Sequence, residues 1–489
     1  MKNRLVLVML ILVILVAPHR VSAVPAGLDT PALDAYVTGQ MAKHGLPGVT
    51  LAITQGNQII YSRGYGTAGD GRPLTPQTPM YIGSQSKSFT ALAIAQLAEQ
   101  GKLDLNAPVR TYIPWFAVAD ADATMRITLF DLLHHTSGLS DAGYSVILPD
   151  DATLEEGVRS LAAAHPTAPI GAQHQYFNMG YAVLQQVIER VSGLRYEEYI
   201  QQNIFAPLGM IHSYGDPTLA RQDDLAQGYS RFFGFAIPAR QPHRAYELGA
   251  GFLISTAEDM ARYAIAMNHA GVYQGALVLS PQWMRKLFAP VQGYGMGWHV
   301  SSAGDHIWHG GANETFRASV ELYPRRGLGI VLLINEGHMV DHYISGPQLL
   351  AGVTAIALGN PPPPVALGWS VRTIGWGLLA LVLALCVLHV FNFRRLRGWP
   401  ARAGRMSPLK RAWEVAISFI IPTIILLVVY TQAKGFWGNR FNLAYQLSML
   451  FSVLPDIGVL MIVGSVPDYV QGLMKLYWVL TGKTRPTQG

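Results

Sequence analysis

The sequence predicts an α/β (α+β) domain, built from an antiparallel sheet and a helical subdomain, followed by a membrane region of three helices. Strand-like runs lie at both ends of residues 24–357, with helical patterns between them. Three apolar segments follow within residues 371–489, and the N-terminus has the form of an export signal. Of the 489 residues only 13% are charged, whereas about 25% is usual for a soluble protein.

The N-terminus has the three parts of a secretory signal peptide. Lys2 and Arg4 precede an apolar run from Leu5 to Ala17, and the small residues Val21-Ser22-Ala23 offer a cleavage site. The apolar run is short for a membrane span, which needs about 20 residues. We therefore expect residues 1–23 to be a removable signal peptide and the domain that follows to lie outside the cytoplasm.

The exported domain begins and ends with readable elements. An amphipathic pattern from Pro31 predicts a helix closed by Gly45, and two β-rich runs flank a Gly56-Asn57 turn, which is typical of a hairpin. Later, Ser255 and Glu258 have the spacing of a helix capping box. Two strands joined by a Pro-Arg-Arg-Gly turn follow in residues 317–335. Strands from both chain ends thus predict one antiparallel sheet with a helical insertion.

The C-terminal part is expected to be a membrane region. Residues 358–370 form a Pro-rich linker whose four consecutive prolines favour a stiff spacer. The spans are expected at about residues 374–391, 415–431 and 443–466, with Pro455-Asp456 as a helix break near an interface. Seven basic residues between the first two spans mark the cytoplasmic side, so we expect a multi-pass protein of the cell membrane. These residues also explain the net charge of +6 through attraction to membrane lipids, without a nucleic-acid partner.

A serine and a lysine lie three residues apart at the start of a helical run. Ser84 and Lys87 would share one helix face, so the lysine can reach the serine hydroxyl. A serine hydroxyl becomes a good nucleophile only when a base takes its proton, and a buried lysine beside a helix N-terminus can be neutral enough to do so. The Ser84 N–H would form half of an oxyanion hole. Taken alone, the spacing equally describes a capping serine and a solvated lysine.

Two further elements follow in order. Tyr176 and Asn178 are two residues apart, so a phenol and an amide can face one site. His309-Gly310-Gly311 lies just before an expected strand. The two glycines would let a ligand approach the backbone closely, and the Ala312 N–H would complete the oxyanion hole. Structural alternatives for these elements are a buried tyrosine and a glycine-rich turn.

The three elements together resemble the serine β-lactamase and penicillin-binding-protein superfamily, for which S-x-x-K is a known motif. The Tyr-x-Asn element is similar to that of the class C β-lactamase and DD-peptidase branch. The resemblance covers roughly residues 27 to 350 and implies a β-lactamase/transpeptidase-like fold. It implies that Ser84 is the acylated nucleophile and that Lys87 and Tyr176 transfer protons, with the identity of the base left open. The implied substrate-binding residues are Asn178, His309, Gly310, Gly311, Ala312 and Asn313.

One position departs from the family pattern. His309 stands where the β-lactamases usually have a lysine, a permanent cation for a substrate carboxylate. The His-x-Gly variant is more similar to DD-peptidases, D-aminopeptidases and related esterases. If His309 must be charged to hold a carboxylate, activity on such substrates should rise below about pH 6.5.

The predicted function is that of a membrane-anchored extracytoplasmic serine hydrolase acting through an acyl-enzyme on a peptide-like amide or ester, with β-lactams among the candidate substrates. One alternative is a sensor that binds penicillin or peptidoglycan with little turnover. Another follows from a layout similar to the colibactin-maturing peptidase, which removes an N-acyl-D-asparagine cap; Asn313 would contact such a cap or simply stabilise a turn.

We expect no cofactor and no metal, since His338 and His342 have a metal-pair spacing without the glutamate of a zinc protease. The oligomeric state stays open.

Overall fold

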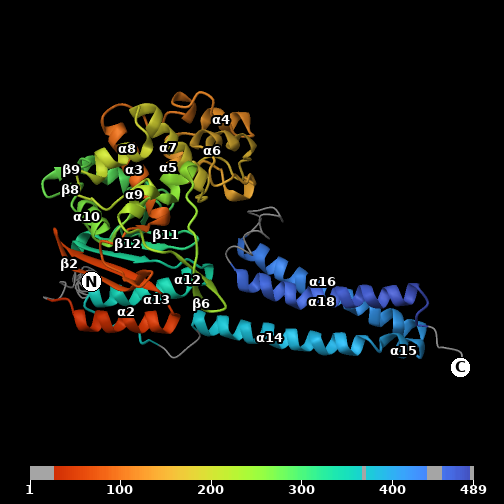
Figure 1. Ribbon diagram of the computed structural model, residues 1–489. Helices are drawn as coiled ribbons and strands as arrows, with labels where there is room; N and C mark the ends of the chain where they lie inside the picture. The colour runs from red at the N-terminus through yellow and green to blue at the C-terminus, as the bar shows by residue number, and fades with distance from the viewer. Residues whose placement is uncertain (1–26, 366–369, 438–453, 485–489) are drawn as a thin grey trace, which may run out of the picture.

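A seven-stranded antiparallel sheet is the base of the first domain (Figure 1). The computed structural model describes residues 27–365, 370–437 and 454–484. The strand order is β10 (His299–Val300), β11 (Ile307–Ala312), β12 (Arg317–Tyr323), β13 (Leu328–Ile334), β1 (Gly48–Gln55), β2 (Gln58–Gly69) and β3 (Arg72–Pro73). Strand β1 pairs with β13 in the register Val49 to Ile334. The two chain ends therefore meet at the centre of the sheet, as the sequence predicts.

Helices cover both faces of this sheet. Helices α2 (Thr30–His44) and α13 (Ser345–Ala357) pack on one face, and α10 (Ala257–Asn268) packs on the other (Figure 1). Alternate side chains of β1 serve the two layers, because Val49 and Leu51 face α2 and α13 while Ala52 joins the larger core on the opposite face.

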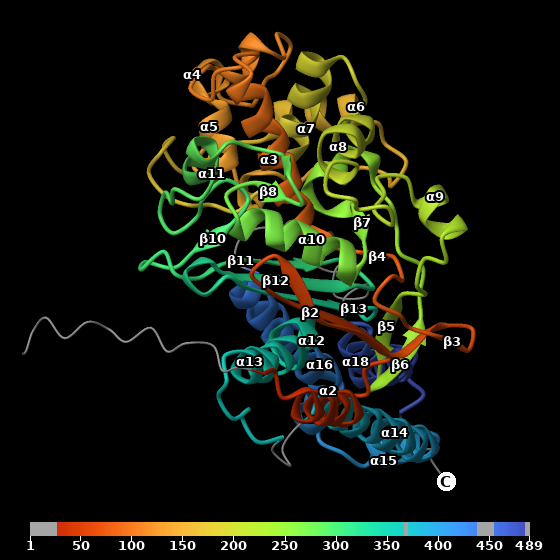
Figure 2. The ribbon, with the colours of Figure 1, turned by 90° about the vertical axis from the view of Figure 1, so that its left-hand side faces the viewer.

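The middle of the chain forms a helical subdomain above the α10 face (Figure 2). Its helices are α3 (Ser86–Glu99), α4 (Ala121–Arg126), α5 (Leu129–Leu133), α6 (Leu154–Ser160), α7 (Asn178–Ser192), α8 (Tyr196–Ile200), α9 (Pro217–Gln222) and α11 (Pro281–Leu287). Helix α3 is buried on every side between the sheet and its neighbours. Short two-stranded pairs complete the domain: β4 (Met80–Tyr81) with β7 (Ile254–Ser255), β5 (Tyr229–Phe232) with β6 (Phe235–Pro238), and β8 (Val272–Tyr273) with β9 (Ala276–Leu277).

Local signals in the sequence place most elements correctly. Helix α2 ends where Gly45 adopts a left-handed conformation, with φ of 69°, and the Gly56-Asn57 turn joins β1 to β2. The expected capping box is wrong by one residue, because Thr256 caps α10 by accepting the Asp259 N–H, while Ser255 is a buried residue of β7.

Among the described residues of the C-terminal region, three helices are long and apolar enough to cross a membrane: α14 (Val371–Leu396), α16 (Pro408–Trp437, with its candidate span at Pro408–Thr431) and α18 (Pro455–Leu480). Short helix α15 (Trp399–Gly404) follows α14. The first two expected spans lie inside α14 and α16. Of the third expected span, residues 443–466, the part before residue 454 lies outside the described residues. Helix α18 starts at Pro455, where the sequence predicts a break, and continues past the expected end to Leu480. The expected signal peptide, residues 1–23, and part of the expected linker also lie outside the described residues.

Candidate active site

Ser84 lies in a tight 3-10 turn, η1 (Gly83–Gln85), immediately before α3. Gly83 has a φ of 54°, and a Cβ at this position would lie 2.4 Å from the backbone N of Ala312. Only glycine therefore lets this turn pack against strand β11. The Ser84 side chain is half-buried, while its neighbours Gly83 and Gln85 are buried, so the hydroxyl stays accessible on a fixed backbone.

Lys87 lies one turn along α3, with its ammonium group fully enclosed. Its Nζ is 3.2 Å from Ser84 Oγ, 2.8 Å from Asn178 Oδ1 and 2.6 Å from the Ala250 carbonyl oxygen. Burial lowers the pKa of Lys87 to about 7, although Glu247 and Asp141 act in the opposite direction. A neutral amine has two N–H groups for Asn178 and Ala250, which leaves its lone pair for the Ser84 hydroxyl.

Tyr176 closes the other side of the amine. Its ring centroid is 4.7 Å from Lys87 Nζ. Burial raises the pKa of Tyr176, and a hydrogen bond with Ser84 only partly opposes this shift. The phenol is therefore protonated at neutral pH, so a tyrosinate is disfavoured, whereas a neutral lysine is readily populated.

His135 packs behind Tyr176 as a supporting ring. It adopts a left-handed backbone, with φ of 57°, and its Nδ1 accepts the Phe177 N–H at 3.2 Å. The His135 and Tyr176 ring centroids are 4.5 Å apart. Burial, together with the nearby Lys87, lowers the pKa of His135 well below its ordinary value. The sequence offered only a pair of adjacent histidines here, since this contact depends on long-range packing.

Strand β11 runs beside the Ser84 turn. The buried Gln85 amide donates to the His309 carbonyl oxygen, and a Cβ on Gly311 would lie 2.0 Å from the Ile82 carbonyl oxygen. Gly311 is thus required for close approach, whereas a Cβ on Gly310 would meet only one atom, at 3.9 Å. The motif lies within the strand rather than before it, which corrects the expected placement. The N–H groups of Ser84 and Ala312 come from the two adjacent segments.

His309 does not point a charge at this cleft. The side chain is 2% exposed, with Nδ1 2.6 Å from the Gly310 carbonyl oxygen and Nε2 3.0 Å from the Tyr294 hydroxyl. The carbonyl can only accept, so Nδ1 carries the proton and Nε2 accepts from Tyr294. Burial, His299 and Lys87 lower the pKa of His309 to about 3. An increase of activity below pH 6.5 through a charged His309 is therefore not expected.

Two asparagines tie the site together. Asn178 is the first residue of α7, and its Oδ1 accepts from Lys87. Asn313 follows β11, and its Nδ2 donates at 2.9 Å to the Gly251 carbonyl oxygen. Gly251 belongs to the π-helical segment η7 (Leu248–Phe252), which also supplies the Ala250 carbonyl to Lys87. Asn313 thus fixes the turn after β11 against the segment that holds the lysine.

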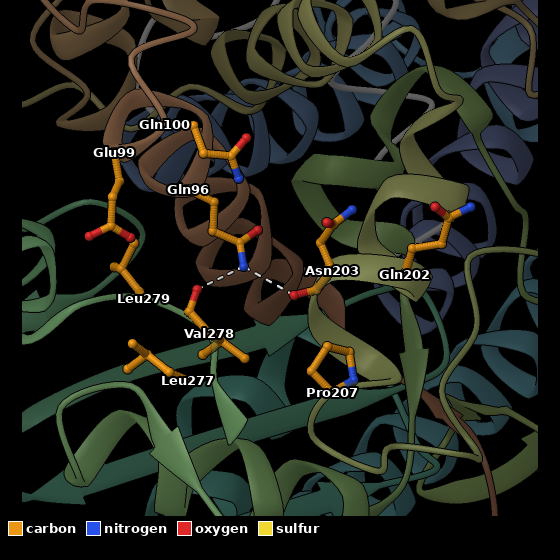
Figure 3. Close-up of a pocket in the computed structure, with 9 residues that line it drawn as sticks. All are labelled: Gln96, Glu99, Gln100, Gln202, Asn203, Pro207, Leu277, Val278 and Leu279. Carbon is orange, nitrogen blue, oxygen red and sulfur yellow. Dashed lines mark hydrogen bonds between the residues drawn. The ribbon is translucent and has the colours of Figure 1, made fainter. Parts of the chain in front are cut away.

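A cavity of about 310 Å³ lies away from these residues (Figure 3). It is lined by Gln96, Glu99, Gln100, Gln202, Asn203, Pro207, Leu277, Val278 and Leu279. The Gln96 amide spans it, donating to the Asn203 and Val278 carbonyl oxygens at 3.0 and 2.8 Å. Because its donor group is engaged in these internal bonds, the cavity contains no chemistry comparable to that around Ser84. Within the described ranges, no group of three or more His, Cys, Asp or Glu side chains could hold a metal ion.

The arrangement of a serine at a helix start, an enclosed lysine and a strand edge is typical of serine acyl-transfer sites. The chain belongs to the beta-lactamase family, since that family's model matches residues 33–353. Members of this family are generally serine hydrolases.

Known relatives are similar in sequence and in fold. Protein flp of Staphylococcus aureus (strain COL) is 23% identical over 439 residues, covering 86% of this chain and 85% of that protein. The octameric penicillin-binding protein homologue from Pyrococcus abyssi has a TM-score of 0.60 and 28% identity, covering 68% of this chain and 78% of that one. A class C beta lactamase from Rhodobacter sphaeroides has a TM-score of 0.55 and 22% identity. The match covers 67% of this chain and 98% of that one, and it shows that the two share a fold.

Proposed function

We propose that this protein is a membrane-anchored extracytoplasmic serine hydrolase that forms an acyl-enzyme on Ser84. The supporting observation is the position of Lys87 Nζ, enclosed among neutral oxygens and 3.2 Å from the Ser84 hydroxyl. The family relationship supports the same reaction class. Basic residues between α14 and α16 support a location of the hydrolase domain outside the cytoplasm.

The reaction would start with proton transfer from the Ser84 hydroxyl to neutral Lys87. Ser84 Oγ then attacks the substrate carbonyl carbon, and the Ser84 and Ala312 N–H groups stabilise the resulting oxyanion. Collapse breaks the bond to the leaving amine or alcohol, which receives the proton from Lys87 directly or through the Tyr176 phenol. Lys87 next takes a proton from water as the water attacks the ester, and the acid leaves with Ser84 restored.

The charges of the site favour substrates without a carboxylate beside the scissile bond. His309 is neutral and both of its ring nitrogens are engaged. Arg244, a nearby cation, has 2.8 Å ion pairs with Asp150 and with Glu314. A carboxylate would therefore have to displace an existing partner. Neutral esters and D-amino-acid amides fit better than DD-carboxypeptidase substrates or β-lactams, because their carboxylates would meet neither a charged His309 nor an unpaired Arg244.

The test is activity-based labelling of the full chain in lipid nanodiscs. A fluorescent fluorophosphonate should attach to Ser84, as located by mass spectrometry, and the wild-type protein should turn over a short ester or a D-amino-acid amide. Ser84→Ala is the matched control and should give neither result. Absence of label at Ser84 between pH 6 and 9 would overturn the proposal, whereas stoichiometric acylation without turnover would support a sensor.

A further inference from the structure

The β5–β6 hairpin joins the hydrolase domain to two of the membrane helices (Figures 1 and 2). Its turn consists of Phe233 and Gly234, with φ of 48° and 81°. The Phe233 N–H donates at 2.8 Å to Asp456, in the first turn of α18. A Cβ on Gly375 of α14 would lie 2.1 Å from the Gly234 N, so the helix backbone touches the turn directly. Both helices thus fix the hairpin at the level of their first turns.

Beyond the turn, β6 carries exposed apolar side chains. Phe235 is 51% exposed and Ile237 is 42% exposed, and their spacing of two places them on one face of the strand. The Phe235 ring lies 6.3 Å from that of Trp376, which is 41% exposed on α14. The Arg372 guanidinium lies 4.7 Å from the Trp376 ring centroid. These four residues form a continuous surface, here called the docking face.

We propose that the docking face inserts into the interfacial layer of the bilayer, with Phe235 and Ile237 at the level of the acyl chains and Arg372 beside a lipid phosphate. The inference rests on the proposal that the three helices span a membrane. After Trp376, helix α14 is apolar over residues 377–388, so a strand packed on that tryptophan lies where headgroups meet hydrocarbon. Tryptophan and arginine are the residues that favour this layer.

The docking face is also linked to the rim of the active site. After β6, the side-chain Oε1 of Gln241 accepts from the Thr315 N–H at 3.0 Å, and its Nε2 donates to the Glu314 carboxylate at 2.7 Å. Arg244 adds an ion pair to Glu314. Glu314 and Thr315 belong to the turn after β11 that begins at Asn313. Insertion of the hairpin into the membrane would therefore help to fix the turn at Asn313, Glu314 and Thr315, which lies beside Ser84.

The experiment measures membrane depth by spin-label accessibility in nanodiscs of phosphatidylethanolamine and phosphatidylglycerol. The single native cysteine, Cys386, lies within α14 and provides the hydrocarbon reference. Ile237→Cys is labelled in a Cys386→Ala background. Leu277→Cys in the same background provides the water reference, because Leu277 is 57% exposed on β9, on the side of the domain away from α14 (Figure 1). Phe235→Cys serves as a second probe of the docking face.

We expect the spin-label accessibility at position 237 to lie between that of the hydrocarbon reference, Cys386, and that of the water reference, Leu277→Cys. Collisions with a water-soluble nickel chelate should be at least about threefold less frequent at 237 than at 277, and collisions with oxygen more frequent. Equal nickel accessibility at 237, 235 and 277, with Cys386 reading as hydrocarbon, would overturn the docking face alone. A water-like reading at Cys386 would overturn the membrane span and the docking face together. Ester hydrolysis by each labelled variant verifies that it is folded.

Discussion

The molecule contains two buried sites with cationic side chains, and they differ in their partners. Beneath the sheet, Arg231 pairs with Asp341 at 2.6 Å and Arg317 pairs with Glu336 at 2.9 Å, and all four side chains are at most 5% exposed. Asp341 lies on helix α12 (Met339–Tyr343). In the candidate active site, Lys87 is equally buried, but its hydrogen-bond partners are the neutral oxygens of Ser84, Asn178 and Ala250.

The difference in partners sets the difference in role. Burial raises the pKa of Asp341, but Arg317 and Arg231 outweigh it and hold the pKa below its usual value, so this carboxylate remains an anion. The Arg231–Asp341 pair therefore keeps its charges, whereas burial and the neighbouring Asp341 raise the pKa of Glu336 to about 8. Together these four side chains act as a structural anchor. Lys87 lacks such compensation in its hydrogen bonds, so its proton is weakly held. A buried cation whose partners are neutral dipoles loses its proton easily and can act as a base. A buried cation paired with carboxylates keeps its charge and stabilises the fold.

The largest expected effect separates these roles at Lys87. Lys87→Met should lower kcat/KM for a neutral ester by roughly 10³-fold or more, because the nucleophile loses its base. Its free energy of unfolding at pH 7 should stay equal or rise, since a costly buried amine is removed. Steady-state kinetics and denaturant unfolding measure the two quantities. A loss of less than tenfold in kcat/KM would remove Lys87 from the mechanism.

The next effect tests the anchor. Arg317→Met should lower the free energy of unfolding by about 3–5 kcal/mol, because it removes the 2.9 Å partner of the buried Glu336 and leaves only Arg231, at 3.7 Å. The folded fraction should keep its kcat for the ester. The double variant Arg317→Met/Glu336→Leu is the control and should recover much of the loss, since both charges are gone. A single variant as stable as the wild type would show that the pair contributes no anchoring.

The pH dependence follows from the same contrast. With a pKa of about 7 for Lys87, kcat/KM should rise about tenfold per pH unit below that value and level off above it. Between about pH 7 and 10.5, the unfolded chain binds a proton that folded Lys87 does not, so this lysine's contribution to stability improves as pH rises through that window. Lys87→Met should abolish this part of the stability profile. An increase of kcat/KM with a midpoint near pH 10 would contradict the role of Lys87 as the base.

A smaller effect concerns substrate charge. Nitrocefin and its methyl ester differ by one carboxylate, and we expect the wild type to acylate with the acid no faster than with the ester, because His309 is neutral. His309→Lys should shift the ratio of rates toward the acid by about tenfold, with His309→Gln as the uncharged control. Stopped-flow acylation measures both rates. A wild-type preference for the acid greater than about tenfold would mean that an unassigned cation binds the carboxylate.

The smallest effect is expected at the junction with the membrane helices. Asp456→Asn weakens the bond that accepts the Phe233 N–H, which corresponds to about 1 kcal/mol and roughly fivefold faster amide exchange at Phe233. Hydrogen–deuterium exchange measures this rate. Asp468→Asn, also on α18, is the matched control and should leave the exchange unchanged. Equal exchange in both variants would mean that the hairpin is held by other contacts.

The sequence predicted the elements that depend on local patterns. The strands of residues 317–335, the Gly45 helix end and the Ser84-Lys87 spacing all follow from periodicity, turn residues and helix geometry. At α18 the sequence predicts a break at Pro455, where the helix begins, because proline is compatible with the first turn of a helix. The helix continues to Leu480, beyond the expected end of the apolar segment. At α10, Ser255 and Thr256 each have an acidic residue three positions later, so the sequence alone left two cap registers open.

The contacts that define the chemistry depend on distant segments. The Ala250 carbonyl oxygen accepts from Lys87, which lies 163 residues earlier in the sequence. Because any residue has a backbone carbonyl, the residue type at position 250 does not reveal this contact. The burial of His309 depends on Tyr294, and the position of β11 depends on the Gln85 amide. Residue types suggested a lysine and a histidine in one site, but only packing distinguishes the weakly protonated base from the neutral, fully bonded imidazole.

The most direct measurement is the titration of Lys87 by NMR. The full chain, labelled with ¹³C at lysine Cε and held in nanodiscs, would be followed from pH 5 to 11. The Lys87 resonance would be assigned by its loss in Lys87→Arg. We predict a midpoint near pH 7, because the effect of burial on the amine outweighs the opposing effects of Glu247 and Asp141. A midpoint near 10.5 would show a permanently charged lysine at neutral pH and would contradict its role as the base for Ser84.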